Sequence, residues 1–244
     1  MQSSPSRRSE LERLGAAPFA HRGLHGGALV ENSGGAIAAA VARGHGVELD
    51  VQLSRDGEAM VFHDYELERL TAGQGPIAAR TAAELQSIRL NLCNEAMPRL
   101  REALSIVGGR APLLIEVKSP DRHVDRLCAA VAEALAGYEG PVGVMSFNPQ
   151  VGAWFARHSP QVLRGLVVTE SGSRGLKGRI GRRLALWRAK ADFLAYDVRD
   201  LPSRFAAAAR ARGLPVYTWT VRSEADRAAA AAHADQIIFE APPR

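Results

Sequence analysis

The sequence predicts an α/β fold, a (β/α)8 TIM barrel with a small insertion after the second strand. Strand-like runs alternate with helical runs along the chain, and eight such strands can be counted. This alternation is typical of a parallel sheet whose strands are joined by helices. The length of 244 residues fits as well, because such barrels need about 250 residues. An open, doubly wound sheet is disfavoured, because it usually has fewer strands and a glycine-rich phosphate loop after the first one.

The predicted strands are short apolar runs bounded by glycine, proline or charged residues. In chain order they are residues 18–22, 46–53, 112–118, 141–147, 163–169, 191–198, 214–221 and 234–239. Several of them carry charged side chains within an otherwise apolar run. A charge in such a position is costly to bury unless something compensates it, so these residues are the first candidates for a functional site.

The predicted helices occupy the segments between these strands. They are residues 33–44, 99–109, 123–138, 149–158, 174–190, 202–213 and 223–233. Their composition is alanine-rich or amphipathic, which favours helix, and glycine and proline mark the changes. Asn32, Ser203 and Ser223 stand at helix starts, where we expect their side chains to act as N-caps.

The connection after the second strand is longer than the others. It begins with a hairpin-like piece, residues 58–64, and continues for some thirty residues more. Loops of this length are uncommon inside a compact domain and are often functional. We expect an insertion at about residues 56–98 that forms a wall or lid of the pocket, within a single domain of residues 15–244. Residues 1–14 are expected to be an N-terminal extension.

The composition indicates a globular protein rather than a membrane-spanning or disordered one. Hydrophobic residues make up 46% of the chain, and no apolar run approaches the roughly 18 residues that a membrane span needs. The N-terminal residues have no apolar segment typical of a secretory signal. The two cysteines, Cys93 and Cys128, form no metal-binding motif and indicate a reducing compartment. We therefore expect a cytoplasmic protein.

The positive charge is concentrated in one predicted helix. The chain has a net charge of +5, whereas residues 174–190 carry seven basic residues and no acidic one, which leaves −2 for the remainder. This distribution does not indicate nucleic-acid binding. The segment also contains apolar residues, so it could lie on an anionic membrane surface. The simpler interpretation, which the sequence favours, is a barrel helix whose outer face is solvated by arginine.

Three carboxylates on two predicted strands suggest a metal site. Glu48 and Asp50 are two residues apart on one strand, so their side chains point to the same side, which we expect to be the barrel interior. Glu116 and Lys118 repeat this spacing on the next barrel strand. A charged layer of acids and lysine without metal is the alternative, but one lysine does not balance three acids. We therefore expect one divalent cation, and the all-oxygen ligands favour Mg²⁺ or Ca²⁺ without distinguishing them.

Two histidines are candidates for proton transfer. His21 ends the first predicted strand beside Arg22, and His63 lies beside Asp64 after the second strand. Imidazole titrates near pH 6.5, so one histidine can act as a base and the other as an acid near neutrality. A single histidine at a strand end is usually a structural hydrogen-bonding group. Two of them around an acid-rich strand favour catalysis.

These residues form a series of spaced motifs that resembles the glycerophosphodiester phosphodiesterase family. The motifs run in order from residue 18 to about residue 240. They are His21-Arg22-Gly23, Glu31-Asn32-Ser33, Glu48-x-Asp50, Val-Phe-His63-Asp64, Ile-Glu116-Val-Lys118, Ser146-Phe147-Asn148 and Trp219-Thr-Val. The resemblance implies a (β/α)8 barrel with an insertion after the second strand. It also implies hydrolysis of glycerophosphodiesters, the deacylated forms of phospholipids, to sn-glycerol 3-phosphate and an alcohol.

The resemblance further implies a role for each site residue. Glu48, Asp50 and Glu116 are similar to the family's metal ligands, and His21 and His63 to its acid/base pair. Arg22 and Lys118 are similar to its phosphate contacts. Phe147 and Trp219 would line the pocket for the glycerol or alcohol part, with simple core packing as the alternative. The chain departs from the family pattern at Val30, where proline is common, and at Glu240, where Asp or Asn is common; the second departure affects the far rim of the pocket.

Two alternative functions are left open by the sequence. One is a phospholipase D that acts on lysophospholipids, with residues 174–190 on the bilayer. The other is an inactive barrel that binds phosphate or lipid, although a binding protein has no need for two proton-transfer groups. The expected partner is a small phosphodiester, and the sequence does not predict an oligomeric state.

Overall fold

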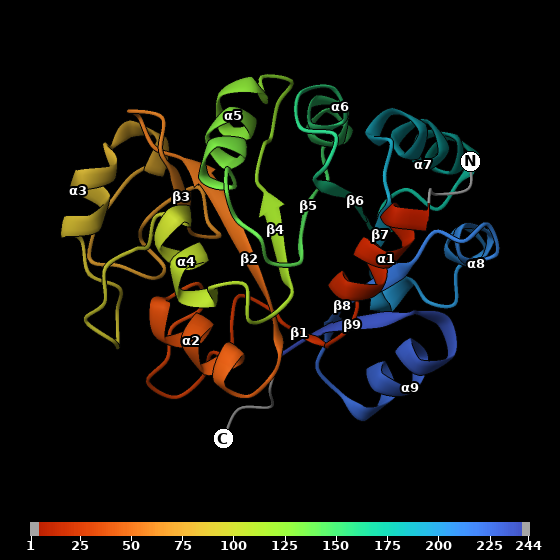
Figure 1. The fold of residues 1–244 in the computed structure, drawn as a ribbon, viewed down its shortest axis with the longest axis horizontal. Helices are drawn as coiled ribbons and strands as arrows, with labels where there is room; N and C mark the ends of the chain where they lie inside the picture. The colour runs from red at the N-terminus through yellow and green to blue at the C-terminus, as the bar shows by residue number, and fades with distance from the viewer. Residues whose placement is uncertain (1–4, 241–244) are drawn as a thin grey trace.

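The computed structural model describes residues 5–240, and it confirms the predicted barrel. Eight parallel strands form a closed ring in which β1 pairs with both β2 and β9 (Figure 1). The barrel strands are β1 (Phe19–Ala20), β2 (Gly46–Leu53), β4 (Leu113–Val117), β5 (Val142–Ser146), β6 (Leu163–Val168), β7 (Phe193–Asp197), β8 (Val216–Val221) and β9 (Gln236–Phe239). All eight coincide with predicted strands. A ninth strand, β3 (Ala59–Val61), runs antiparallel to β2 and lies outside the ring.

The seven predicted helices are present between the strands and cover the outside of the barrel (Figure 1). They are α2 (Gly34–Ala42), α4 (Leu100–Val107), α5 (Asp125–Ala134), α6 (Pro149–His158), α7 (Leu176–Ala189), α8 (Arg204–Arg210) and α9 (Glu224–His233). A short 3-10 helix, Val198–Asp200, precedes α8. Ser203 and Ser223 cap α8 and α9 as predicted. The N-cap of α2 is Ser33 and not Asn32, the residue predicted from the sequence. Asn32 instead adopts a left-handed backbone conformation.

The core has two layers, because successive side chains of a strand point to opposite faces. Val47, Leu49 and Val51 of β2 pack outward against the helices, as the sequence indicates. The barrel interior is filled by large side chains such as Phe193 and Tyr217. Helix α1 (Pro5–Leu14) adds Leu11 and Leu14 to this inner layer. It lies at the end where the strands begin, since the Tyr217 hydroxyl donates to the Leu11 carbonyl at 3.5 Å. The opposite end of the barrel is therefore left for the site.

The long connection after β2 folds over a small core of its own. After β3 it contains a 3-10 turn, Ile77–Ala79, and helix α3 (Ala82–Ser87). The buried apolar residues of this small core are Val30, Met60, Phe62, Leu67, Ile77, Ala82, Leu85, Leu90 and Met97. Val30 comes from the loop that precedes α2, so this small core also fixes that loop. The insertion thus forms a wall beside the carboxyl ends of β2 and β4.

None of the helices within residues 5–240 has the length and apolarity required to span a bilayer.

Candidate active site

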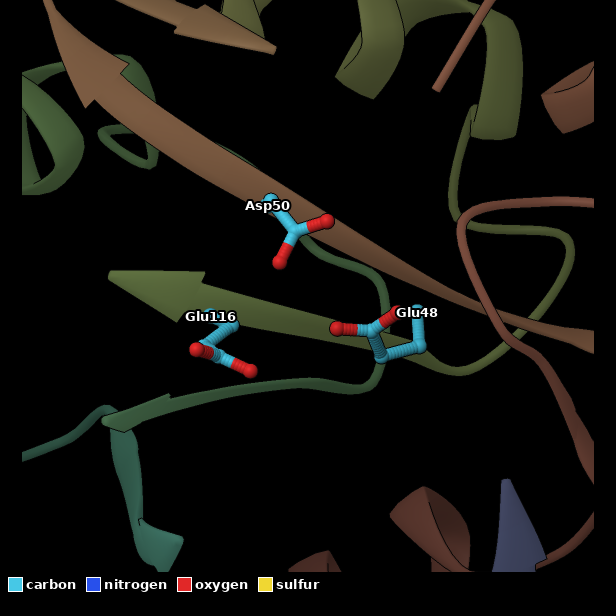
Figure 2. A group of neighbouring side chains, drawn as sticks. All are labelled: Glu48, Asp50 and Glu116. Atoms are coloured by element: carbon cyan, nitrogen blue, oxygen red, sulfur yellow. The ribbon is translucent and has the colours of Figure 1, made fainter. Parts of the chain in front are cut away.

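The three predicted carboxylates converge inside the mouth of the barrel. Asp50 of β2 and Glu116 of β4 are directly paired in the sheet register, and Glu48 lies two residues before Asp50. One carboxylate oxygen from each of the three lies within 4.8 Å of the others. Figure 2 shows the three groups turned toward one another from their two strands. Glu48 and Asp50 are each 1% exposed and Glu116 is 8% exposed, so the cluster is shielded from water.

Two cations contact this cluster without satisfying it. The Lys118 Nζ lies 3.0 Å from Asp50 Oδ1 and 2.7 Å from Glu116 Oε1. The Arg22 Nε lies 3.3 Å from Asp50 Oδ2, and the Arg22 backbone N–H donates to Glu48 Oε2 at 3.0 Å. Within the part of the chain that the structure describes, the buried Glu48 Oε1 accepts no hydrogen bond. A buried acceptor without a partner is costly, and the donor set of three carboxylates suits a hard divalent cation. The residues present therefore fit such an ion.

The pKa shifts show the same imbalance of charge. Burial alone would raise the pKa of Asp50, but the charges of Lys118 and Arg22 outweigh it and lower that pKa to about 2. Burial raises the pKa of Glu48 well above its usual range, and repulsion from Asp50 and Glu116 adds to this. Burial also raises the pKa of Glu116, although Lys118 opposes the shift. The two neighbouring cations thus offset the burial of Asp50 but not that of Glu48 and Glu116.

His21 points one ring nitrogen at the cluster and the other away from it. Its Nε2 lies 3.9 Å from Glu48 Oε2, and its Nδ1 lies 2.7 Å from Glu240 Oε1. Burial lowers the pKa of His21, although the hydrogen bond with Glu240 opposes this. Glu240 is held in turn by Arg222, whose Nε lies 2.6 Å from Glu240 Oε2. Glu240 is therefore the orienting partner of His21. The sequence shows Glu240 only as a departure from the family motif, although its place directly after the last strand was a signal for this role.

His63 stands on the insertion rather than on the barrel. Its Nδ1 lies 2.6 Å from Asp64 Oδ1, and it is partly buried. Burial lowers its pKa, against the attraction of Asp50. Asp64 also pairs with Arg69, a residue that the sequence did not single out. Each histidine thus has its own carboxylate partner on the Nδ1 side.

The loop after β1 adopts unusual backbone conformations that place two side chains at Asp50. Arg22 and Asn32 have positive φ angles of 56° and 61°. The Asn32 amide donates to Asp50 Oδ2 at 2.9 Å, and its backbone N–H donates to the Arg22 carbonyl at 2.8 Å. Gly23 follows with φ 79°, and a Cβ there would lie 2.8 Å from the Ala36 backbone, which explains the glycine. Glu31 is ion-paired with Arg22 at 2.7 Å.

A cavity of about 890 Å³ opens beside the cluster. His63, Glu116, Lys118 and Phe147 line it, together with Tyr65 of the insertion. Phe147 is 47% exposed, so it is not a core residue. It meets Trp219 edge to face, with ring centroids 5.6 Å apart, and the Trp219 Nε1 donates to the Ala195 carbonyl at 2.9 Å. Phe147 therefore lines the cavity as predicted, whereas Trp219 is partly buried against the inner layer of the core and is not among the described residues that line this cavity.

The comparisons with known proteins agree with this geometry. The model of the glycerophosphoryl diester phosphodiesterase family matches residues 21–242. A putative glycerophosphodiester phosphodiesterase of Bacillus subtilis is 26% identical over 216 residues, which cover 84% of this chain and 86% of that protein. A phosphodiesterase of Oleispira antarctica, solved in complex with the product sn-glycerol-3-phosphate, has a TM-score of 0.81 and 25% identity, with 92% of this chain and 93% of that one covered.

Other matches are shorter or are to structures alone. A putative glycerophosphoryl diester phosphodiesterase of Silicibacter pomeroyi has a TM-score of 0.79 and 25% identity, with 96% and 94% of the two chains covered. Two curated glycerophosphodiester phosphodiesterases, from Bacillus subtilis and Caldanaerobacter subterraneus, are matched over 31% and 46% of their lengths at 34% and 32% identity. The family model covers nearly the whole barrel. The fold, the converging acids and this match together show that the chain belongs to the glycerophosphoryl diester phosphodiesterase family.

Proposed function

We propose that this protein hydrolyses glycerophosphodiesters to sn-glycerol 3-phosphate and an alcohol. The observation that carries the proposal is the buried cluster of Glu48, Asp50 and Glu116 with a histidine on either side. The product complex of the Oleispira antarctica relative supports the substrate class. An inactive binding barrel is disfavoured because both histidines have oriented ring nitrogens, which binding alone does not require.

The cluster would hold one divalent cation, Mg²⁺ or Ca²⁺, through Glu48, Asp50 and Glu116. Such an ion supplies Lewis-acid stabilisation of negative charge on the phosphate. Arg22 and Lys118 already contact the same carboxylates, so they lie where phosphate oxygens would meet them. Together they would stabilise the charge that develops on the phosphate during the reaction.

Proton transfer is assigned to the two histidines. Glu240 has a lowered pKa and is ionised, because its hydrogen bonds with His21 and Arg222 outweigh its burial. It therefore accepts a hydrogen bond from the Nδ1–H of His21 and leaves Nε2 unprotonated to act as a base. We infer that His21 removes the proton of the glycerol 2-hydroxyl as that oxygen attacks phosphorus. His63 donates a proton to the leaving alcohol as its bond to phosphorus breaks. Water then opens the resulting cyclic phosphate with the two roles reversed.

The test is incubation of the protein with glycerophosphocholine and related glycerophosphodiesters, with and without a chelator, and assay of glycerol 3-phosphate. We expect product only when Mg²⁺ or Ca²⁺ is available. Product formation that is unchanged by a chelator would contradict the cation. A substrate methylated on the 2-hydroxyl should be inert; its normal hydrolysis would show direct attack by water instead.

A lysophospholipid is a second candidate substrate, and the exposed apolar side chains of α7 favour it. Hydrolysis of lysophosphatidylcholine and glycerophosphocholine should be compared under the same conditions. A clear preference for the lysolipid would identify a phospholipase D-type activity. The cytoplasm is the compartment that we propose, since Cys93 and Cys128 are both free thiols.

A further inference from the structure

Helix α7 presents an apolar face to solvent instead of to the barrel. Leu176, Ile180, Leu184 and Trp187 are 70%, 49%, 60% and 77% exposed. They are spaced by four, four and three residues, so they form one stripe about 80° wide on a helix with about 100° per residue. Barrel helices normally turn such a stripe inward. The solvated arginine face favoured by the sequence is thus only part of the arrangement.

The inward face of α7 contains two alanines, Leu186 and one buried arginine. Ala189 is 1% exposed and Arg182 is 8% exposed. Arg182 donates to the Ser173 carbonyl at 2.9 Å and pairs with Glu170 at 3.1 Å. A Cβ at Gly178 would collide with the Ser173 carbonyl, so this face is in close contact with the preceding loop. These contacts fix the rotation of α7 about its axis and keep the apolar stripe outward.

Basic residues flank the stripe on both sides. By helical geometry, Arg179 and Arg183 lie along one edge and Lys177 and Arg188 along the other, and Lys190 follows as the C-cap of the helix. All five are exposed, and within residues 5–240 none of them forms an ion pair through its side chain. An apolar stripe with unpaired cations on both edges is the arrangement of helices that lie in the interface of an anionic bilayer.

We propose that α7 docks this protein onto the surface of anionic phospholipid membranes. The apolar stripe would enter the boundary between head groups and acyl chains, and the flanking cations would contact the lipid phosphates. A second copy of the chain is a poorer occupant, because a two-fold contact would place two unpaired basic faces together. A nucleic acid is also a poorer one, because its phosphates offer nothing to the leucine and isoleucine side chains.

The docking surface lies apart from the catalytic mouth. Helix α7 connects β6 and β7, whereas the carboxylates stand on β2 and β4, across the ring of strands (Figure 1). None of the stripe or flanking residues lines the cavity beside the cluster. Membrane binding and hydrolysis of a small substrate can therefore be tested separately. A negative result for one proposal does not contradict the other.

The experiment is sedimentation of the full chain with vesicles of phosphatidylcholine alone or with about one third phosphatidylserine. We expect binding only to the anionic vesicles, with release at high salt because the attraction is screened. Lipids brominated on the acyl chains should quench the fluorescence of Trp187, and this quenching should be lost in Trp187→Phe. Equal binding to neutral vesicles, or protein that stays in the supernatant, would overturn the proposal.

Two pairs of matched variants separate this face from general charge and hydrophobicity. Arg183→Glu with Arg188→Glu should weaken vesicle binding by at least about 30-fold, whereas Arg43→Glu with Arg89→Glu, an equal charge change at other exposed sites, should weaken it far less. Leu184→Ser should weaken binding about five- to tenfold, and Leu92→Ser, at a residue that is 86% exposed in the insertion, should not. All four variants should hydrolyse glycerophosphocholine as the wild type does, which shows that they are folded. If the members of each pair bind vesicles alike, α7 is not the docking surface.

Two other occupants would reveal themselves in the same samples. Light scattering without vesicles that shows a dimer, abolished by Leu184→Ser, would mean that a second copy covers the stripe. Retention of a duplex oligonucleotide by protein that ignores the vesicles would mean a nucleic-acid surface. Either result would overturn membrane docking.

Discussion

The two histidines have similar hydrogen-bond partners but stand on different parts of the fold. Each has a carboxylate on its Nδ1, Glu240 for His21 and Asp64 for His63. That carboxylate selects the ring tautomer and holds the ring in place, as second partners of catalytic histidines commonly do. His21 is held by the barrel, whereas His63 is held by the insertion.

Replacement of His21 or His63 by Ala should lower kcat by about 10²–10⁴, because each is assigned one proton transfer in each step. The measurement is steady-state kinetics with glycerophosphocholine at saturating cation. His25→Ala is a suitable control, since this histidine has no assigned role. Near wild-type turnover in either variant would remove that histidine from the mechanism.

Glu240→Gln should lower the stability of the fold in a pH-dependent way. The folded-state pKa of Glu240 lies well below its usual value, so its contribution is present above the unfolded pKa of about 4.3 and is lost as pH falls toward the folded value. Loss of the charge-assisted bonds should cost about 1–3 kcal/mol of unfolding free energy near pH 7. Urea unfolding at a series of pH values should show the difference from wild type shrinking below about pH 4. A constant difference across that range would rule out the ionised carboxylate as its source.

At the scale of elements, α1 closes one end of the barrel. The carboxyl ends of the strands, at the opposite end, carry the site residues. Leu14 is fully buried in the interior layer with Phe19 and Tyr217. The sequence predicted only an extension at residues 1–14, because one short helix rich in charge shows no clear apolar face. Its packing depends on contacts with residues about 200 positions away.

Leu14→Ala should lower the unfolding free energy by about 2–5 kcal/mol, through lost burial and the cavity that remains. Denaturant unfolding measures this directly. Leu92→Ala is the matched control, because Leu92 is 86% exposed and such surface changes usually stay within about 0.5 kcal/mol. Similar losses in the two variants would mean that α1 adds nothing to the core.

At the scale of the whole molecule, the stability of the fold should depend on cation binding to the acid cluster. The three buried carboxylates and the unpartnered Glu48 Oε1 lower the free energy of unfolding, and a bound cation would remove this cost. A ligand that binds only the folded state stabilises it by about 2.7 kcal/mol at 100 times its dissociation constant.

Addition of Mg²⁺ or Ca²⁺ should therefore raise the thermal midpoint by several degrees, and a chelator should reverse this. For a chain of this size, about 1 kcal/mol corresponds to about 2–4 °C. Glu48→Gln should be more stable than wild type without cation, because a neutral amide replaces a carboxyl group whose charge is opposed by burial and by repulsion from Asp50 and Glu116. It should also gain less from the cation. Differential scanning calorimetry with a cation titration tests both. A midpoint that does not respond to either ion would contradict the site.

The fold and the convergence of the three carboxylates could be predicted because they depend on local pattern. Apolar runs with alternating polar positions identified the strands, and the two-residue spacing of Glu48 and Asp50 already placed both carboxylates inside. Other features depend on contacts between distant segments. The pairing of His21 with Glu240 joins residues 219 positions apart, and the outward rotation of α7 is set by Arg182 and Glu170. The place of Glu240 directly after the last strand is a local signal, but its choice of His21 as partner and the rotation of α7 depend on these distant contacts.

His63, one of the two proposed catalytic histidines, stands on a segment that has its own small core. The apolar residues of the insertion pack mainly with one another, so heat can loosen this segment while the barrel stays folded. His63 would then leave the carboxylates although Glu48, Asp50 and Glu116 remain in place. Loss of activity on heating should accordingly precede the loss of far-ultraviolet circular dichroism, and early inactivation should be reversible on cooling.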